Sequence, residues 1–317
     1  MGIVLTGSIA YDYIMTFPGK FRDHILPDRL DRLSLSFLVD SMVRQRGGVA
    51  ANIAYTLALL GERPLVMATV GEDFDDYRQW LDRCGVDTSG IRTIPGLLTA
   101  SFFVNTDQAN SQIASFYTGA MARAAELRFA DLPSLPDLAV ISPNDPGAMA
   151  AYVEECRRLG IPYLYDPSQQ IVRLPIEALR QGIQSCRGLV VNDYEFALIE
   201  DKTGLDRAQI LTAAEFLLIT CGERGAVLHT PGRETVVPAV PERAVVDPTG
   251  VGDAFRAGFL KGYLHRLSLD LCSQMGALAA TYCLENQGPQ SHTFDLPEFI
   301  ARFRRHFDDH GALDALL

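Results

Sequence analysis

Two kinds of hydrophobic pattern alternate along the chain. Short runs of adjacent apolar residues are typical of strands, and apolar residues at every third or fourth position are typical of amphipathic helices. The pattern predicts strands at 2–9, 64–70, 99–105, 112–118, 137–142, 161–165, 187–191, 216–220 and 225–230. It predicts helices at 49–60, 74–84, 147–159, 174–183, 206–215, 251–265, 268–284 and 295–307. Such alternation of strands and helices indicates an α/β layered domain.

The predicted strands after about residue 137 are continuous apolar runs, such as LAVIS, GLVVN and FLLIT. A strand that alternates apolar and polar residues buries one face, whereas a continuous apolar run is buried on both faces. These strands therefore predict a mostly parallel central sheet with helices on both sides, in three α/β/α layers.

Two regions have a different pattern. Residues 11–46 are polar and mixed, and residues 97–121 hold two half-polar strands joined by DQAN. Half-polar strands suit a small sheet with one face open to solvent. No linker or internal repeat is visible, so we expect one domain over 1–317, with a lid formed by about 11–46 and 97–121.

The charge balance limits the partners of the protein. The chain has 28 Lys and Arg against 39 Asp and Glu, a formal net charge of −11, and its basic residues are not clustered. Binding to a phosphate backbone needs clustered Lys and Arg, so nucleic acid is excluded as a partner. No apolar run approaches the ~18 residues of a membrane span, and six cysteines without paired spacing indicate free thiols. We expect a cytoplasmic protein.

The stretch DPTGVGDAF at 247–255 combines two glycines with an acidic residue at the start of a predicted helix. Gly250 and Gly252 allow backbone angles that other residues avoid, and the free N–H groups of a helix start bind anions. Asp253 lies in the same first turn. It is either a helix-stabilising aspartate or a base that stands beside a phosphoryl group held by the amides.

A second helix entered through glycines begins at GGVAAN, residues 47–52. Gly48 either makes a tight turn or lets a polyhydroxyl substrate approach the backbone. Asn52 is either an incidental polar residue or a ligand of substrate hydroxyls. Neither segment fits the GxxxxGK[ST] pattern or the GxGxxG dinucleotide fingerprint, so a dinucleotide oxidoreductase lacks its expected motif.

Five motifs in order resemble the ribokinase-like (PfkB) family of carbohydrate and nucleoside kinases. They are GSIAYD (7–12), GGVAAN (47–52), NDYE (192–195), TCGERG (220–225) and DPTGVGDAF (247–255). The chain departs from the family pattern at Pro248, where threonine is usual, and at Val251, where alanine is usual. The stretches LSFLVDSM (35–42), NSQIASFYTGAM (110–121) and DPTGVGDAFRAG look most like the adenosine or nucleoside kinase branch.

The resemblance implies a fold and a set of roles. The fold would be ribokinase-like, with a small β-sheet lid. Asp253 would be the general base, and the transferring phosphate would be held by amides of Gly250, Val251 and Gly252. Substrate-binding residues would be Asp12, Gly48 and Asn52 for the ribose, and Gln112 and Phe116 for the base. ATP-binding residues would be Asn192, Thr220, Gly222, Gly225 and Asn286.

The same resemblance implies ions. Asn192 and Glu195 would act on Mg²⁺ through water, and a helix-start role is the alternative for Glu195. Asp247 and Thr249 would line a site for a monovalent cation such as K⁺.

The expected activity is transfer of phosphate from ATP to the 5′-hydroxyl of a nucleoside, adenosine first. A sugar kinase acting on ribose or fructose is the alternative within the family, and a non-catalytic nucleoside sensor is the alternative outside it. The partner would be the small-molecule substrate, and the protein would be a monomer or homodimer.

Overall fold

A nine-stranded sheet forms the centre of the computed structural model, which describes residues 2–25 and 34–317. Its strand order is β13-β12-β11-β10-β9-β8-β1-β4-β5. The strands are β1 (Ile3–Thr6), β4 (Leu65–Val70), β5 (Ile91–Thr93), β8 (Leu138–Ile141), β9 (Tyr163–Tyr165), β10 (Gly188–Asn192), β11 (Phe216–Thr220), β12 (Ala226–Thr230) and β13 (Arg233–Val237). Neighbours from β11 to β5 pair in parallel, and β12 and β13 add antiparallel edge strands. The predicted mostly parallel sheet is confirmed.

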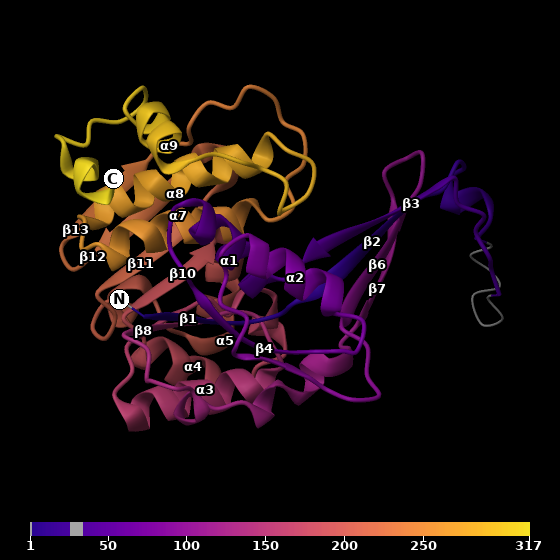
Figure 1. Cartoon of the computed structure of the whole chain (residues 1–317), viewed down its shortest axis with the longest axis horizontal. Coiled ribbons are helices and arrows are strands. Elements are labelled where there is room, and N and C mark those ends of the chain that lie inside the picture. Colours follow the sequence, from indigo (N-terminus) through magenta and orange to yellow (C-terminus); the bar gives the residue numbers. More distant parts are fainter. Residues whose placement is uncertain (1, 26–33) are drawn as a thin grey trace.

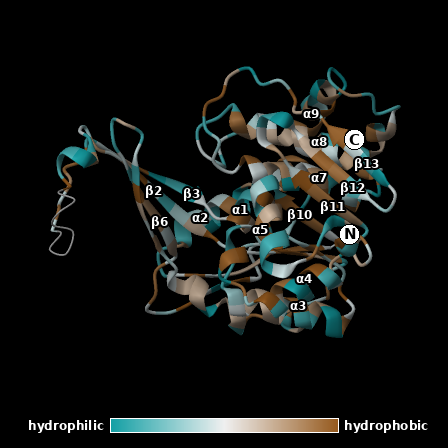
Figure 2. Cartoon of the chain, turned by 180° about the vertical axis from the view of Figure 1, so that it is seen from behind, coloured by the Kyte–Doolittle hydropathy of each residue, from teal (hydrophilic) through white to brown (hydrophobic). Residues whose placement is uncertain are grey.

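Helices cover both faces of this sheet (Figure 1). On one side lie α1 (Val49–Leu59), α2 (Asp75–Arg83), α7 (Val251–Leu264), α8 (Leu269–Leu284) and α9 (Leu296–Phe303). On the other side lie α3 (Pro146–Leu159), α4 (Ile176–Ser185), α5 (Asp193–Thr203) and the short α6 (Arg207–Ile210). The central strands are hydrophobic along their length, as Figure 2 shows for β10 and β11. Burial on both faces explains why these strands have no polar side.

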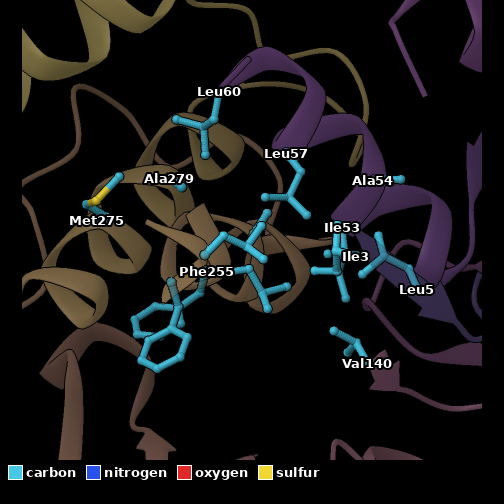
Figure 3. Packing of buried hydrophobic residues seen from close by; sticks show 14 of the residues in the cluster. Ile3, Leu5, Ile53, Ala54, Leu57, Leu60, Val140, Phe255, Met275 and Ala279 are labelled. Carbon is cyan, nitrogen blue, oxygen red and sulfur yellow. The ribbon is translucent and has the colours of Figure 1, made fainter. Parts of the chain in front are cut away.

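Strand β1 shows how one strand serves two hydrophobic cores. Successive side chains of a strand point to opposite faces. Ile3 and Leu5 therefore pack against α1, close to Ile53 and Leu57 (Figure 3), whereas Val4 belongs to the cluster under α3 and α4. The two cores fix the helix layers against the two faces of the sheet. This packing positions the strand ends that build the site.

A second, four-stranded sheet projects from the edge of the layered body (Figure 1). It consists of β2 (Ala10–Thr16), β3 (Ser41–Gly47), β6 (Ala100–Thr106) and β7 (Gln112–Tyr117), in the order β3-β2-β6-β7. These strands come from the two regions in which the sequence predicts a lid. Residues 26–33 of the first region lie outside the described residues.

Two predicted elements differ from the structure. The strand predicted at 2–9 is interrupted after Thr6, and β2 begins at Ala10 because the chain leaves the central sheet there to enter the lid. The helix predicted at 206–215 ends at Ile210, and tight turns then lead the chain into β11. The hydrophobic pattern also missed β2, β3, β5, β13 and α5.

No helix in the described part of the chain has the length and apolar character needed to cross a membrane. The six cysteines, all within the described residues, are free thiols, as their spacing predicts.

Candidate active site

The carboxyl ends of the parallel strands and the first turns of α1 and α7 meet at one edge of the central sheet. Ligands of open α/β sheets bind outside the carboxyl ends of the strands. Asn52 Nδ2 in α1 donates a 2.8 Å hydrogen bond to Asp253 Oδ2 in α7, so two motifs 201 residues apart in the chain touch here. The two helices entered through glycines therefore share one site.

The first turn of α7 leaves backbone amides free. Gly250 caps the helix in the left-handed region, with φ of 77°, and no side chain caps this end. Within residues 2–25 and 34–317, the amides of Gly250, Gly252 and Asp253 donate to no protein group, whereas the amide of Val251 donates a long, 3.4 Å hydrogen bond to the carbonyl of Pro248. A Cβ atom at Gly250 would lie 2.4 Å from Cβ of Pro289, so only glycine fits this position. These amides are available to an anion.

Asp253 is buried and is held from two sides. Besides the bond from Asn52, its Oδ1 lies 3.6 Å from Nη1 of Arg256, one turn along α7. Burial raises the pKa of Asp253, whereas the Arg256 charge and the Asn52 hydrogen bond hold that pKa down. A carboxylate whose pKa is raised by burial, while a cation and a donated hydrogen bond still favour its charged form, is suited to accept a proton.

Arg256 is itself fixed by a buried carboxylate. Asp166, which follows β9, lies 2.6 Å from Nε of Arg256 and accepts a 2.8 Å hydrogen bond from its Nη2. Burial raises the pKa of Asp166 to about 7, although Arg256 counteracts this effect. The pair keeps the guanidinium beside Asp253.

The predicted substrate residues of the lid share one face. Asp12 on β2 is opposite Phe102 on β6, which is opposite Phe116 on β7, and directly opposite residues point to the same side of a sheet. Gln112 lies four positions from Phe116, so it points to this side as well. Burial, followed by the charges of Asp253 and Asp247, raises the pKa of Asp12 to about 6. This lid face and the Asp253 site therefore lie next to each other.

Close packing requires a glycine at position 48. Its φ is 96°, and a Cβ atom there would lie 2.6 Å from Ile9 Cα and from the carbonyl oxygen of Ser8. Close packing of the α1 start against the link between β1 and β2 thus requires glycine. The same absence of a side chain leaves the backbone open to a substrate, which remains a prediction.

The residues predicted for the nucleotide gather at the ends of β10 and β11. Asn192 and Thr220 are direct neighbours in the parallel pairing. Asn192 and Glu195 form a capping box on α5, with bonds of 2.7 and 2.8 Å, so the helix-start role of Glu195 is real. The other oxygen of Glu195 accepts a bond from Ser168. The capping role does not exclude a role toward Mg²⁺, because carboxylate oxygens have further lone pairs.

The two glycines of the TCGERG motif differ in whether the surrounding structure leaves room for a side chain. Gly222, with φ of 59°, has open space where a Cβ would lie, whereas a Cβ at Gly225 would lie 2.1 Å from the carbonyl oxygen of Val237. Gly225 is therefore fixed by contact with β13. Asn286, just after α8, donates a hydrogen bond to the carbonyl of Tyr282, and among the described residues it has no hydrogen bond to Asn192 or Thr220.

Asp247 connects two loops. Its Oδ1 accepts the amide of Thr249, and its Oδ2 accepts Gln287 Nε2 and the amide of Gly288, at 2.8 to 2.9 Å. Three donors of the protein itself therefore already occupy much of the hydrogen-bonding capacity of the Asp247 carboxylate. Across the described residues, no group of three or more His, Cys, Asp or Glu side chains could hold a metal ion.

A family comparison decides the identity of this site. The model described as pfkB family carbohydrate kinase matches residues 8–295. This chain belongs to the pfkB family. The match covers all five motifs from Ser8 onward and confirms the resemblance seen in the sequence. As a pfkB kinase with the ribokinase-like fold, the chain is an ATP-dependent kinase.

Similar proteins within the family are nucleoside kinases. The nucleoside kinase of Burkholderia thailandensis in complex with inosine has 36% identity and a TM-score of 0.86, covering 96% of this chain and 98% of that one. The nucleoside kinase of Methanocaldococcus jannaschii superposes with a TM-score of 0.87 at 26% identity, over 96% and 99% of the two chains. A nucleoside kinase of Methanothermobacter thermautotrophicus is 28% identical over 305 residues, 95% of each chain.

Sequence reasoning missed three polar residues that surround Asp253 and Asn52 in the candidate site, namely Asp166, Arg256 and Gln290. Arg256 could have been found, because it lies three positions after Asp253 on a helix, where side chains meet. Asp166 could have been suspected from its place directly after a parallel strand. Gln290 lies in an irregular loop and gives no signal in the sequence.

Arg256→Met is expected to move the acid limb of the kcat profile to higher pH by about one unit or more. Removing the cation raises the pKa of Asp253 further, and a base must be ionised to accept a proton. Turnover at low pH therefore falls most. Profiles of kcat against pH check this, with the exposed Arg157→Met as control and Arg256→Lys as the variant that keeps the charge. An unshifted acid limb in Arg256→Met would contradict the role of Arg256.

Proposed function

We propose that this protein is a nucleoside kinase that transfers the γ-phosphoryl group of ATP to the 5′-hydroxyl of a nucleoside, with adenosine preferred. One observation carries the proposal: a buried carboxylate, Asp253, lies in the same helix turn as the free amides of the glycine-rich segment. The similarity to nucleoside kinases, one of them bound to inosine, supports a nucleoside as the acceptor.

In this proposal Asp253 takes the proton of the 5′-hydroxyl as that oxygen forms its bond to the γ-phosphorus. The bond between the γ-phosphorus and the bridging oxygen breaks, and ADP leaves. Amides of Gly250, Val251 and Gly252 donate to the oxygens of the transferring group, where negative charge collects. Phosphoryl transfer needs mainly such positioning and charge stabilisation. The proton then passes from Asp253 to solvent after release.

Asp12 and Asn52 bind the ribose hydroxyls in this proposal. The pKa of Asp12 near 6 leaves its carboxylate ionised at neutral pH, ready to accept from two hydroxyls. The amide of Asn52 uses one N–H on Asp253 and keeps the other for the substrate. Gly48 lets the sugar come close to the backbone, and the lid covers the base.

The nucleotide side follows the same reasoning. Thr220, Gly222, Gly225 and Asn286 line the ATP site in this proposal. Mg²⁺ would neutralise triphosphate charge, and Asn192 and Glu195 fit it best through water, because Mg²⁺ keeps several waters and these side chains already cap α5. A K⁺ ion at Asp247 and Thr249 stays a prediction, since protein donors already contact that carboxylate.

The lid face gives a substrate prediction. Phe116 is 46% exposed on the face that holds Asp12, and Tyr117 is 43% exposed on the opposite face. Stacking of a base on an aromatic ring is worth about 1–3 kcal/mol. Phe116→Ala is therefore expected to raise KM for adenosine roughly 5- to 150-fold, and Tyr117→Ala to leave it unchanged. Equal KM values in the two variants would remove Phe116 from the base site.

ADP release with Mg·ATP tests the function over adenosine, inosine, guanosine, cytidine, ribose and fructose. We expect turnover on nucleosides, fastest on adenosine, with kcat/KM on free sugars lower by about 100-fold or more. Turnover on free sugars alone would assign the protein to the sugar kinases of the family. Nucleoside binding without any ADP would favour a sensor.

A further inference from the structure

A row of four buried or half-buried polar side chains runs from α2 to the carboxylate of Asp253. Trp80 Nε1 donates to Gln290 Oε1 at 3.3 Å, Gln290 Nε2 donates to Asn52 Oδ1 at 2.9 Å, and Asn52 Nδ2 donates to Asp253 Oδ2 at 2.8 Å. The row joins α2, the loop after α8, α1 and α7. None of these contacts is local in the sequence, the separations being 210, 238 and 201 residues.

The chemistry of the first member sets the direction of the whole row. An indole N–H can only donate, whereas an amide side chain has one donor end and one acceptor end. Trp80 therefore turns the oxygen of Gln290 toward itself and the NH₂ group of Gln290 toward Asn52. Since Asn52 receives a donor at its oxygen, its own NH₂ group must face Asp253.

A fifth side chain supports the same orientation. Gln290 Nε2 also donates to the hydroxyl of the fully buried Tyr77, and that hydroxyl donates onward to the carbonyl of Gly47 at 2.9 Å. Because the Tyr77 proton is used on a carbonyl, its oxygen can only accept from Gln290. Two independent partners thus hold the amide of Gln290 the same way round.

We propose that Gln290, oriented by Trp80, is a positioning residue that fixes the amide of Asn52 so that it donates to the Asp253 carboxylate. The inference rests on the proposed role of Asp253 as the base. Gln290 acts through Asn52 and does not touch the reacting atoms. The row selects one orientation of an amide that could otherwise present its oxygen to the carboxylate.

The consequence is a base that is held in one orientation and whose charged form is favoured by the donated hydrogen bond. A hydrogen bond donated to a carboxylate favours its charged form, whereas a facing amide oxygen would favour the protonated form. Other groups also act on Asp253 and must stay constant in a test. They are Arg256 on α7, Asp166 after β9, Glu195 on α5, Asp12 on the lid strand β2 and Cys283 on α8.

The test measures the pKa of Asp253 directly, from the ¹³C carboxyl resonance that disappears in Asp253→Asn. Gln290→Met keeps the side-chain length, adds no charge, and removes the donor to Asn52. We expect it to raise the pKa of Asp253 by on the order of one unit. The acid limb of kcat should move upward by the same amount. Gln181→Met on the surface of α4 is the matched control and should cause no shift.

A second background separates positioning from a general structural effect. In Asn52→Ala, the row no longer reaches Asp253. Adding Gln290→Met to this variant should therefore cause no further shift in the pKa of Asp253. Interacting residues show such non-additivity, and independent ones do not. A shift of equal size in both backgrounds, or no shift in either, would overturn the proposal.

Trp80→Phe keeps the test usable if Gln290→Met does not fold. It retains an aromatic ring and removes only the N–H, so we expect a smaller shift in the same direction, and an unchanged pKa would count against the proposal. Because the carboxyl resonance needs no turnover, a protein that phosphorylates no nucleoside would refute the proposed function while leaving this inference to be decided by the pKa values alone.

Discussion

Asp253→Asn is expected to lower kcat about 10²- to 10⁴-fold, the usual contribution of a positioned base. The substitution keeps the size of the side chain and its contact with Asn52, and it removes only the ability to take a proton. The free amides of Gly252 and Asp253 belong to the backbone and remain in place. Steady-state turnover and the Kd for the nucleoside, measured on the same preparation, check the expected loss of kcat with binding retained.

The thermal midpoint serves as the control for folding in Asp253→Asn. Burial raises the pKa of Asp253 in the folded state, so the folded protein binds this proton more tightly than the unfolded chain. Stability from this group is present at low pH and is lost as pH rises through the folded pKa. At pH 8 the neutral variant should therefore be as stable as wild type or more stable. Turnover within about threefold of wild type would sink the assignment of Asp253.

Gly250→Ala is expected to reduce kcat by about 100-fold or more, because a displacement of about 1 Å in an active site has effects of that size. The new Cβ would lie 2.4 Å from Cβ of Pro289, and the backbone has a φ of 77° that disfavours side chains. Either Pro289 or the first turn of α7 must move. The amides that we assign to the transferring phosphate would then lose their positions.

Gly61→Ala is the matched control for the backbone cost. Gly61 also has a positive φ, 84°, but no atom lies within 4 Å of its missing Cβ. Roughly 1–2 kcal/mol of stability should be lost there without an effect on turnover. Assays of both variants below their unfolding temperatures separate the two effects. Equal turnover in Gly250→Ala and Gly61→Ala would show that the position of the α7 amides does not matter.

The sequence could predict the local geometry of those parts of the candidate site that lie within one short segment. The glycine-rich start of α7 and the first turn of α1 each carry their geometry in adjacent residues, so their motifs were sufficient. The central strands were also visible, because burial on both faces requires continuous apolar runs. Helix α5 is absent from the predicted helices, although the helix-start alternative for Glu195 falls on its first turn, and the capping box of Asn192 and Glu195 is the signal that could have found it.

Strand β3 and the polar contacts between distant segments could not be predicted. Most side chains of β3 are exposed or half-buried at the edge of the lid, so selection for burial leaves no alternating pattern there. The contacts of Gln290 with Asn52, and of Arg256 with Asp166, join residues 238 and 90 positions apart. Such pairs arise from how the layers pack. The identity of each residue alone does not indicate which distant residue it will contact.

The measurement that tests the central claim most directly is ³¹P NMR of the products formed from Mg·ATP and adenosine, with Asp253→Asn in parallel. The account predicts ADP and adenosine 5′-monophosphate in equal amounts for wild type, and about 100-fold less of either product, or lower still, for the variant over the same time. Adenosine that binds but stays unphosphorylated, or a 5′-monophosphate formed equally well by Asp253→Asn, would contradict it.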